Sequence, residues 1–260
     1  MKKCLLAMLL CFFAVAFAVG CGADNPSSDG EKSNSNGTTD VNGKNDNSNT
    51  ETQSKLAYEI TDTGFKFYTN SREEVVYSAY VEIANTGGCD IYMDKCVFDF
   101  EDNDGHLLQS DDNVYSFSSV VSPGEKGYFF NYIGSSTIDK GVSLDNGIKL
   151  VPQVKLTEAK DKPVSYPVSD VSVRMGDSNE IKIIGRIENT SDKNADYVFV
   201  NVVFYDTAGK AIAVSGGSVK NIEAGMKSGF EVSIWGTDGI LKLEDIADTK
   251  VVAEEIYIQK

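Results

Sequence analysis

The chain repeats part of its own sequence at an offset of 104 residues, and this repeat most strongly constrains its fold. Residues 80–86 (YVEIANT) are echoed by residues 184–190 (IGRIENT). Residues 98–102 (FDFED) align at the same offset with residues 202–206 (VVFYD). A repeat of this length predicts two copies of one domain, each of about 100 residues.

The two copies are expected at residues 57–157 and 164–260, with residues 158–163 as the linker between them. A turn marks the same place in both copies, because residues 123–126 (PGEK) align with residues 224–227 (AGMK) after a short change in length. The linker is charged and carries a proline, which is typical of a boundary between domains.

Within each copy, apolar and polar residues alternate over short runs separated by turn residues, as in half-buried strands. We expect a strand at residues 91–101, closing strands at 154–156 and 256–258, and a helical turn only within residues 241–248. The side chains expected to face the cores are Tyr77, Ala79, Val81, Ile83, Cys96, Phe98, Phe100, Ile181, Ile183, Ile187, Val200, Val202 and Phe204. The predicted fold class is all-β, with two tandem immunoglobulin-like antiparallel β-sandwiches.

The N-terminal segment has the pattern of an export signal. An apolar run of 17 residues, 4–20, follows Lys2 and Lys3 and ends in small residues. As a helix it would span roughly 25 Å, less than the ~30 Å hydrocarbon core of a bilayer. We therefore predict that residues 1–20 are a signal peptide.

Ala18, Val19, Gly20 and Cys21 resemble the lipobox of bacterial lipoproteins, although Ala18 replaces the usual leucine. The resemblance implies that the Cys21 thiol receives a diacylglycerol and that Cys21 becomes the mature N-terminus. Two acyl chains on one residue give stable anchoring. The alternative is an ordinary secretory signal in which the cysteine has no role.

Residues 21–56 are rich in Ser, Asn, Asp, Gly and Thr and have almost no apolar side chains. Such a segment cannot bury enough surface to fold, so we expect a disordered tether. The expected location is the extracytoplasmic face of a cell membrane. The length of the tether favours a Gram-positive cell wall, and a periplasmic location stays open.

The formal charge of −15 becomes −17 when Lys2 and Lys3 leave with the signal. This charge repels phosphates and anionic headgroups, so nucleic acid is excluded as a partner and the membrane is expected only through the lipid. Cationic partners or divalent ions would be tolerated, and no cofactor is expected. A protein or cell-wall partner is left unidentified.

The second copy resembles the FxLYD domain family of bacterial lipoproteins. The resemblance rests on Asn189-Thr190, the run 202–206, Gly209, and the turn 223–225. It departs from the family at Val202 and Phe204, which stand where the family has phenylalanine and leucine. It implies an extracytoplasmic sandwich and no catalytic site, because the motif residues are structural.

Two cysteines, Cys89 and Cys96, lie in the predicted domains. An exported protein can form a disulfide, but seven residues of strand span roughly 20 Å, against ~4.4–6.8 Å between the α-carbons of a bridge. We favour a buried Cys96 thiol and a loop Cys89 over a bridge.

An acidic run is the best candidate for a calcium site, because hard cations prefer oxygen ligands. Its candidate ligands are Asp99, Glu101, Asp102 and Asp104. The run lacks the EF-hand spacing, and a hairpin turn is the favoured interpretation.

Aromatic residues form a candidate ligand face that could stack on sugar rings or dock a protein. Tyr128, Phe130 and Tyr132 alternate along one predicted strand, and Trp235 lies at the equivalent strand end of the second copy. The favoured alternative is that the same domain or its neighbour covers this face.

We predict a non-catalytic binding or structural module. The single histidine, His106, follows a turn and has no expected partner for acid–base chemistry. One alternative is an accessory subunit or sensor of an envelope transport or stress system. Another is a calcium- or carbohydrate-binding surface protein.

Overall fold

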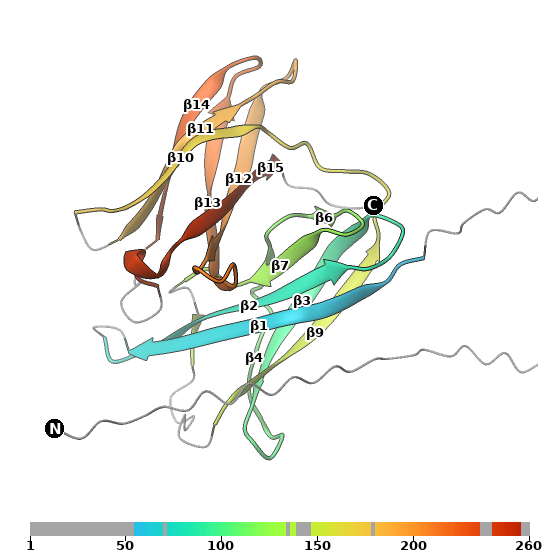
Figure 1. Cartoon of the computed structure of the whole chain (residues 1–260), viewed down its shortest axis with the longest axis vertical. Coiled ribbons are helices and arrows are strands. Elements are labelled where there is room, and N and C mark those ends of the chain that lie inside the picture. The colour runs from blue at the N-terminus through green and yellow to red at the C-terminus, as the bar shows by residue number, and fades with distance from the viewer. Residues whose placement is uncertain are drawn as a thin grey trace, which may run out of the picture. The chain divides into compact units, whose positions relative to one another are not determined.

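The computed structural model describes residues 55–69, 72–133, 136–138, 147–177, 180–234 and 241–255 (Figure 1). These residues form strands that pair antiparallel throughout, and the predicted all-β fold class is confirmed. A single 3₁₀ turn, η1 (Leu243–Asp245), lies inside the stretch where a helical turn was expected. Within the described ranges, no helix has the length and apolar character to cross a membrane.

The first sandwich consists of two sheets that pack face to face. Sheet A has the order β1-β2-β7-β5, and β8 also pairs with β2. In sheet B, β3 pairs with β4, β6 and β9. The strands are β1 (Tyr58–Thr69), β2 (Val75–Asn85), β3 (Ile91–Glu101), β4 (Leu107–Asp111), β5 (Tyr115–Ser116), β6 (Val120–Val121), β7 (Lys126–Phe130), β8 (Ser136–Thr137) and β9 (Lys149–Glu158).

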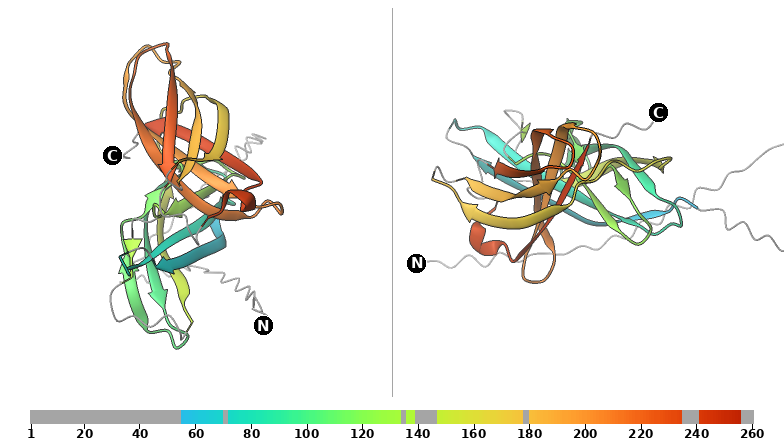
Figure 2. Two further views of the ribbon diagram at one scale, coloured as in Figure 1. Left: turned by 90° about the vertical axis from the view of Figure 1, so that its left-hand side faces the viewer. Right: turned by 90° about the horizontal axis from the view of Figure 1, so that it is seen from above.

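The second sandwich is built from the strands that follow. Sheet C has the order β13-β12-β15, and sheet D has the order β10-β11-β14. The strands are β10 (Val168–Met175), β11 (Ile181–Glu188), β12 (Ala195–Tyr205), β13 (Ala211–Ile222), β14 (Lys227–Ile234) and β15 (Asp248–Glu255). Figure 2 shows the two sets of strands, blue to yellow and yellow to red, from two further sides.

The residues predicted to face the cores do so. In the first sandwich, Phe98 and Phe100 of β3 pack against Val81 and Ile83 of β2 within one buried cluster. In the second sandwich, Val202 and Phe204 belong to the equivalent cluster. Strand β3 has the predicted bounds, 91–101. The expected strand at 154–156 lies within β9, whereas residues 256–258 lie outside the described residues.

The two sandwiches share the same strand register. Tyr80 lies opposite Phe130, and the equivalent pair in the second copy is Ile184 and Glu231. The register of β3 on β4 shifts between Phe100 and Glu101, and that of β12 on β13 shifts one repeat later, between Phe204 and Tyr205. Because even this bulge recurs, the sequence repeat is a repeat of structure.

The Asn-Thr motif has a structural role in both copies. Asn189 Nδ2 donates to the carbonyls of Lys193 (2.8 Å) and Ile222 (3.0 Å), and its Oδ1 accepts the Ser191 N–H. Asn85 makes the matching bonds, donating to the carbonyls of Cys89 and Val121 and accepting the Gly87 N–H. Each side chain joins the end of one sheet to the backbone that leads into the other.

The two cysteines of the first sandwich are free thiols, and both are buried. Cys96 faces the core from β3, as expected, and burial raises its pKa to about 12. Cys89 lies in the connection before β3. Neither thiol is placed to react as a thiolate at neutral pH.

Candidate functional site

A third buried cluster lies between the two sandwiches, and we call it the seam. Its residues come from the outer faces of sheets A and C and from the connection after β5. They are Tyr80, Phe117, Tyr128, Phe130, Val203, Ala211 and Val214. Ser78 and Glu82, on the same outward face of β2, are buried as well. The second sandwich therefore covers a sheet face that an isolated domain would expose to water.

Glu82 is a buried carboxylate whose bonds are complete. Thr61 Oγ1, Lys126 Nζ and Tyr128 OH each donate to it at 2.6 Å. Burial alone would raise the pKa of Glu82, but these hydrogen bonds, led by that of Lys126, hold it below its usual value. Glu82 is thus a charged, paired group that orients Tyr128 at the seam.

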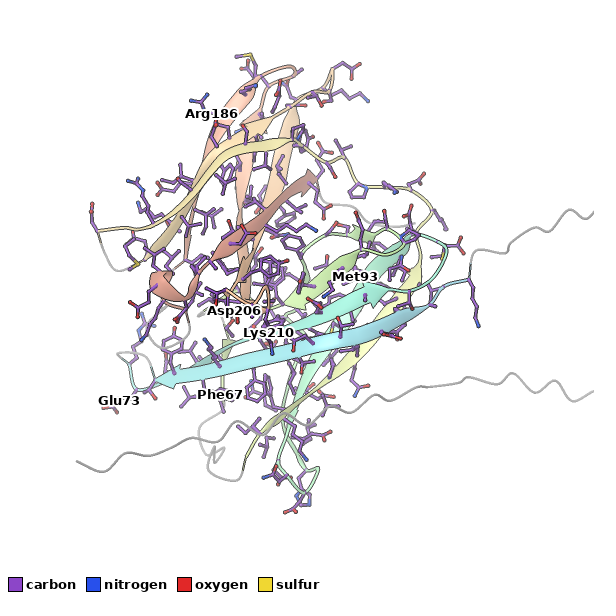
Figure 3. The ribbon with its side chains drawn as sticks, viewed as in Figure 1. Phe67, Glu73, Met93, Arg186, Asp206 and Lys210 are labelled. Atoms are coloured by element: carbon purple, nitrogen blue, oxygen red, sulfur yellow. The ribbon has the colours of Figure 1, made fainter. Side chains whose placement is uncertain are left out.

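The turn between β12 and β13 closes over the same outward face of β2. The Tyr80 hydroxyl lies 2.5 Å from the Ala211 carbonyl oxygen and 2.9 Å from Asp62 Oδ2. Lys210 Nζ pairs with Asp62 Oδ1 at 3.3 Å. Figure 3 labels Lys210 and Asp206 where this turn lies beside β2.

A pocket of about 140 Å³ opens along the seam. It is lined by Tyr115, Ser116, Ser119, Tyr132, Phe199, Asn201 and Glu254. The rings of Tyr115 and Tyr132 are 4.6 Å apart between centroids, and Phe199 stacks edge-on against Tyr197 at 5.1 Å. The seam pocket therefore combines aromatic walls with one carboxylate, and both sandwiches contribute to it.

Glu254 is 3% exposed, and its two carboxylate oxygens accept different numbers of hydrogen bonds. Oε1 accepts the Ser119 N–H at 2.6 Å and the Ser119 hydroxyl at 3.1 Å. Oε2 has the Ser118 hydroxyl at 3.2 Å, but that hydroxyl is also 3.0 Å from the Val120 carbonyl oxygen. Because a hydroxyl has one proton, Oε2 shares its donor with the backbone.

The charge of Glu254 has no cationic partner among the residues that the structure describes. Burial raises the pKa of Glu254, and the hydrogen bonds from Ser119 and Ser118 only partly oppose this effect. It thus contrasts with Glu82, whose lysine partner stabilises the ionised form.

No family model matches the chain, and no curated protein matches it either. A seam pocket of this kind can bind a ligand between its rings and its carboxylate.

Replacing Glu254 with glutamine should change how stability depends on pH. The folded-state pKa of Glu254 is raised, so its contribution to stability is present below the ordinary value of 4.5 and is lost as the pH rises through the folded pKa. Glutamine has no such loss, so E254Q should gain stability relative to the native chain across that window. The free energy of unfolding, measured by urea denaturation at several pH values, checks this.

Glu82 contributes the opposite slope, because its pKa is lowered, but it does so in both proteins. The difference between E254Q and the native chain therefore isolates Glu254. A difference that stays constant with pH, or that shifts against E254Q as the pH rises, would contradict the assignment.

The aromatic candidate face needs a correction. Tyr128 and Phe130 are buried in the seam, so they cannot form an open surface for sugars or a protein partner. Their cover is the second sandwich, the alternative favoured from the sequence. Tyr132 is half-buried and lines the seam pocket, whereas Trp235 lies outside the described residues.

The structure brings together part of the calcium candidate. Oxygen atoms of Asp102 and Asp104 and a ring nitrogen of His106 lie within 4.8 Å of one another. Asp99 and Glu101 are outside this group, on β3, where Asp99 accepts the Ser110 hydroxyl at 2.6 Å. His106, expected to have no partner, has its Nδ1 3.0 Å from Asp102 Oδ2 and stays exposed.

The position of Asp102 has a structural explanation. Its Oδ1 accepts the N–H groups of Asp104 and His106 in the β3–β4 turn. Asp206 makes the same two bonds in the β12–β13 turn, to Ala208 and Lys210, without an acidic cluster. The following glycines have a positive φ in both turns, +83° at Gly105 and +74° at Gly209. The favoured hairpin-turn interpretation therefore accounts for Asp102.

The lipobox residues Ala18, Val19, Gly20 and Cys21 lie outside the described residues. The residues that sequence reasoning missed are Tyr115, Asn201 and Glu254. Glu254 lies opposite Phe199 of β12, whereas Lys155 lies opposite Lys95 at the equivalent place on β3. The two copies therefore carry opposite charges at this position. That difference is the one signal that could have found Glu254.

Proposed function

We propose that this chain is a lipid-anchored, extracytoplasmic, non-catalytic binding module of the FxLYD-like type. In this proposal Cys21 carries the lipid, residues 21–56 form the tether, and the paired sandwiches are the displayed body. The seam pocket is the binding site. The observation that carries the binding role is a buried carboxylate among aromatic rings at the junction of two sandwiches.

The anchoring part of the proposal is supported by the sequence. Two lysines, an apolar run too short to span a bilayer, and small residues before Cys21 are the parts that lipoprotein export needs. The polar segment that follows gives the body reach from the membrane.

The binding part is supported by the seam. Asn201 Nδ2 donates to the carbonyls of Ser116 (3.3 Å) and Phe117 (3.0 Å), which ties the backbone beside Tyr115 to β12. Glu254 ties the Ser118-Ser119 backbone to β15 in the same way. The pocket walls are thus held in place before a ligand arrives, which lowers the entropic cost of binding.

Globomycin, which inhibits lipoprotein signal peptidase, should cause an uncleaved lipidated precursor to accumulate in the native host. Cys21→Ser should release the protein from the membrane fraction or leave it unprocessed. Immunoblotting of fractionated cells after labelling with a palmitate analogue measures both effects. Unchanged processing in globomycin, or label retained on C21S, would refute the anchor.

A further inference from the structure

We propose that the seam pocket binds a small organic cation, an alkylammonium group, between the aromatic rings of Tyr115, Tyr132 and Phe199 with Glu254 as its counter-charge. This inference rests on the proposed binding function and names its ligand class.

The buried charge of Glu254 is poorly compensated. Taking a carboxylate out of water is costly unless a partner of opposite charge or several hydrogen bonds replace the water. Glu254 is almost fully buried, yet one of its oxygens has only the shared Ser118 hydroxyl. A bound cation would supply the missing partner.

Aromatic rings form part of the pocket wall. Ring faces attract cations, most strongly where water is excluded. Tyr115 and Tyr132 form a close tilted pair, and Phe199 adds a third ring from the second sandwich. Burial raises the pKa of Tyr132 to about 12, so this phenol stays neutral at physiological pH.

The size of the pocket suits a small cation. The pocket volume is about 140 Å³, and a dry protein cavity of about 150 Å³ is large enough for benzene. Tetramethylammonium, a protonated butylamine, or the end of a lysine side chain is of this size. A larger ligand would enter with its ammonium end only.

The first sandwich has neither the carboxylate nor the phenylalanine ring at the equivalent positions. At the position of Glu254 it has Lys155, which pairs with Asp94 at 2.6 Å. At the position of Phe199 it has Lys95. The carboxylate and the ring therefore occur on sheet C, which lines the seam pocket, and not at the equivalent positions of sheet B.

The test is a ligand-observed proton NMR titration of the full-length lipidated protein in a non-ionic detergent at physiological salt. Tetramethylammonium is the probe, and tert-butanol is its neutral analogue. We expect saturable binding of tetramethylammonium, and binding of tert-butanol at least tenfold weaker. Butylammonium and Nα-acetyl-lysine, titrated in the same way, distinguish a free amine from a peptide side chain as the source of the ammonium group.

Glu254→Gln should weaken tetramethylammonium binding at least tenfold, because it removes the charge and keeps the shape. The matched control is Glu255→Gln, which removes the neighbouring carboxylate on β15, a group bonded to Tyr166 and absent from the pocket lining. It should leave binding within twofold. Tyr115→Leu, at an exposed ring, should weaken binding about threefold, which tests the aromatic wall separately from the charge.

Binding should also weaken as the pH falls through the pKa of Glu254, because the protonated carboxyl carries no charge. The side chains that line the pocket with Glu254 or bond to it include no other carboxylate and no amine; they are Tyr115, Ser116, Ser118, Ser119, Tyr132, Phe199 and Asn201. Lys250, farther along β15, lies 5.9 Å over the Phe117 ring. Absence of saturable binding, equal binding of tert-butanol, or equal loss in E255Q would overturn the proposal. None of these outcomes bears on the anchor, which the globomycin experiment tests alone.

Discussion

Replacing Asn189 with alanine should lower the free energy of unfolding by about 3 kcal/mol. The side chain is fully buried, and its amide group donates hydrogen bonds to the carbonyls of Lys193 and Ile222. Alanine would leave these carbonyls without donors and the Ser191 N–H without an acceptor. Each buried polar group left unsatisfied costs about 1–3 kcal/mol. Guanidinium denaturation followed by circular dichroism measures the loss.

The matched control is Asn194→Ala. Asn194 lies five positions along the chain, and its Oδ1 accepts the Ala224 N–H in an exposed bond. Its removal should cost less than about 1 kcal/mol. Asn85→Ala should cost as much as N189A, because the bonds of Asn85 match those of Asn189. Equal midpoints for N189A and N194A would contradict the structural role of the motif.

Replacing Val203 with aspartate should uncouple the two sandwiches. Val203 is 0% exposed, and it faces the seam while its neighbours Val202 and Phe204 face the core of the second sandwich. A carboxylate there would be taken out of water, and Lys250, opposite Val203 on β15, would only partly offset this, so we expect a cost of roughly 2 kcal/mol. Separation of the sandwiches lets water reach the charge. We therefore expect two thermal transitions in calorimetry for V203D and one for the native chain.

The control for this variant is already present in the chain. Asp99 occupies the equivalent position on β3, where none of the described strands of the second sandwich covers the sheet, so an aspartate is compatible with the strand itself. The reciprocal change, Asp99→Val, should shift stability by less than about 0.5 kcal/mol. A single transition for V203D at the native midpoint would show that the seam does not couple the sandwiches.

The cores could be predicted from the sequence because strand alternation determines which side chains share a face. It located Phe98, Phe100, Val202 and Phe204 correctly. Alternation cannot tell whether a second layer covers the other face, so the burial of Tyr80 and Glu82 needed the structure. Glu254 was missed for the same reason, since Ser119 lies 135 residues before it. Turns were predictable because they depend on neighbouring residues: Asp102 accepts the His106 N–H, and Gly105 between them adopts the positive φ.

The contact at the seam joins two different sheets, one from each sandwich, so it is a head-to-tail contact. Sheet A of the first sandwich meets sheet C of the second, and no other described strand covers the outer faces of sheet B and sheet D. Head-to-tail contacts between like units propagate into filaments unless something stops them.

On the outer faces of sheets B and D, polar and charged residues replace the apolar residues of the seam, and they oppose such growth. Where sheet A has Tyr128, Phe130 and Tyr132, the equivalent positions of sheet D are Gly229, Glu231 and Ser233. On β11, Arg186 takes the place of Glu82, and Figure 3 labels it on the second sandwich. On β3, Asp99 and Glu101 stand where β12 has Val203 and Tyr205. A further copy docking on either of these faces would have to bury these groups, which opposes head-to-tail growth into filaments.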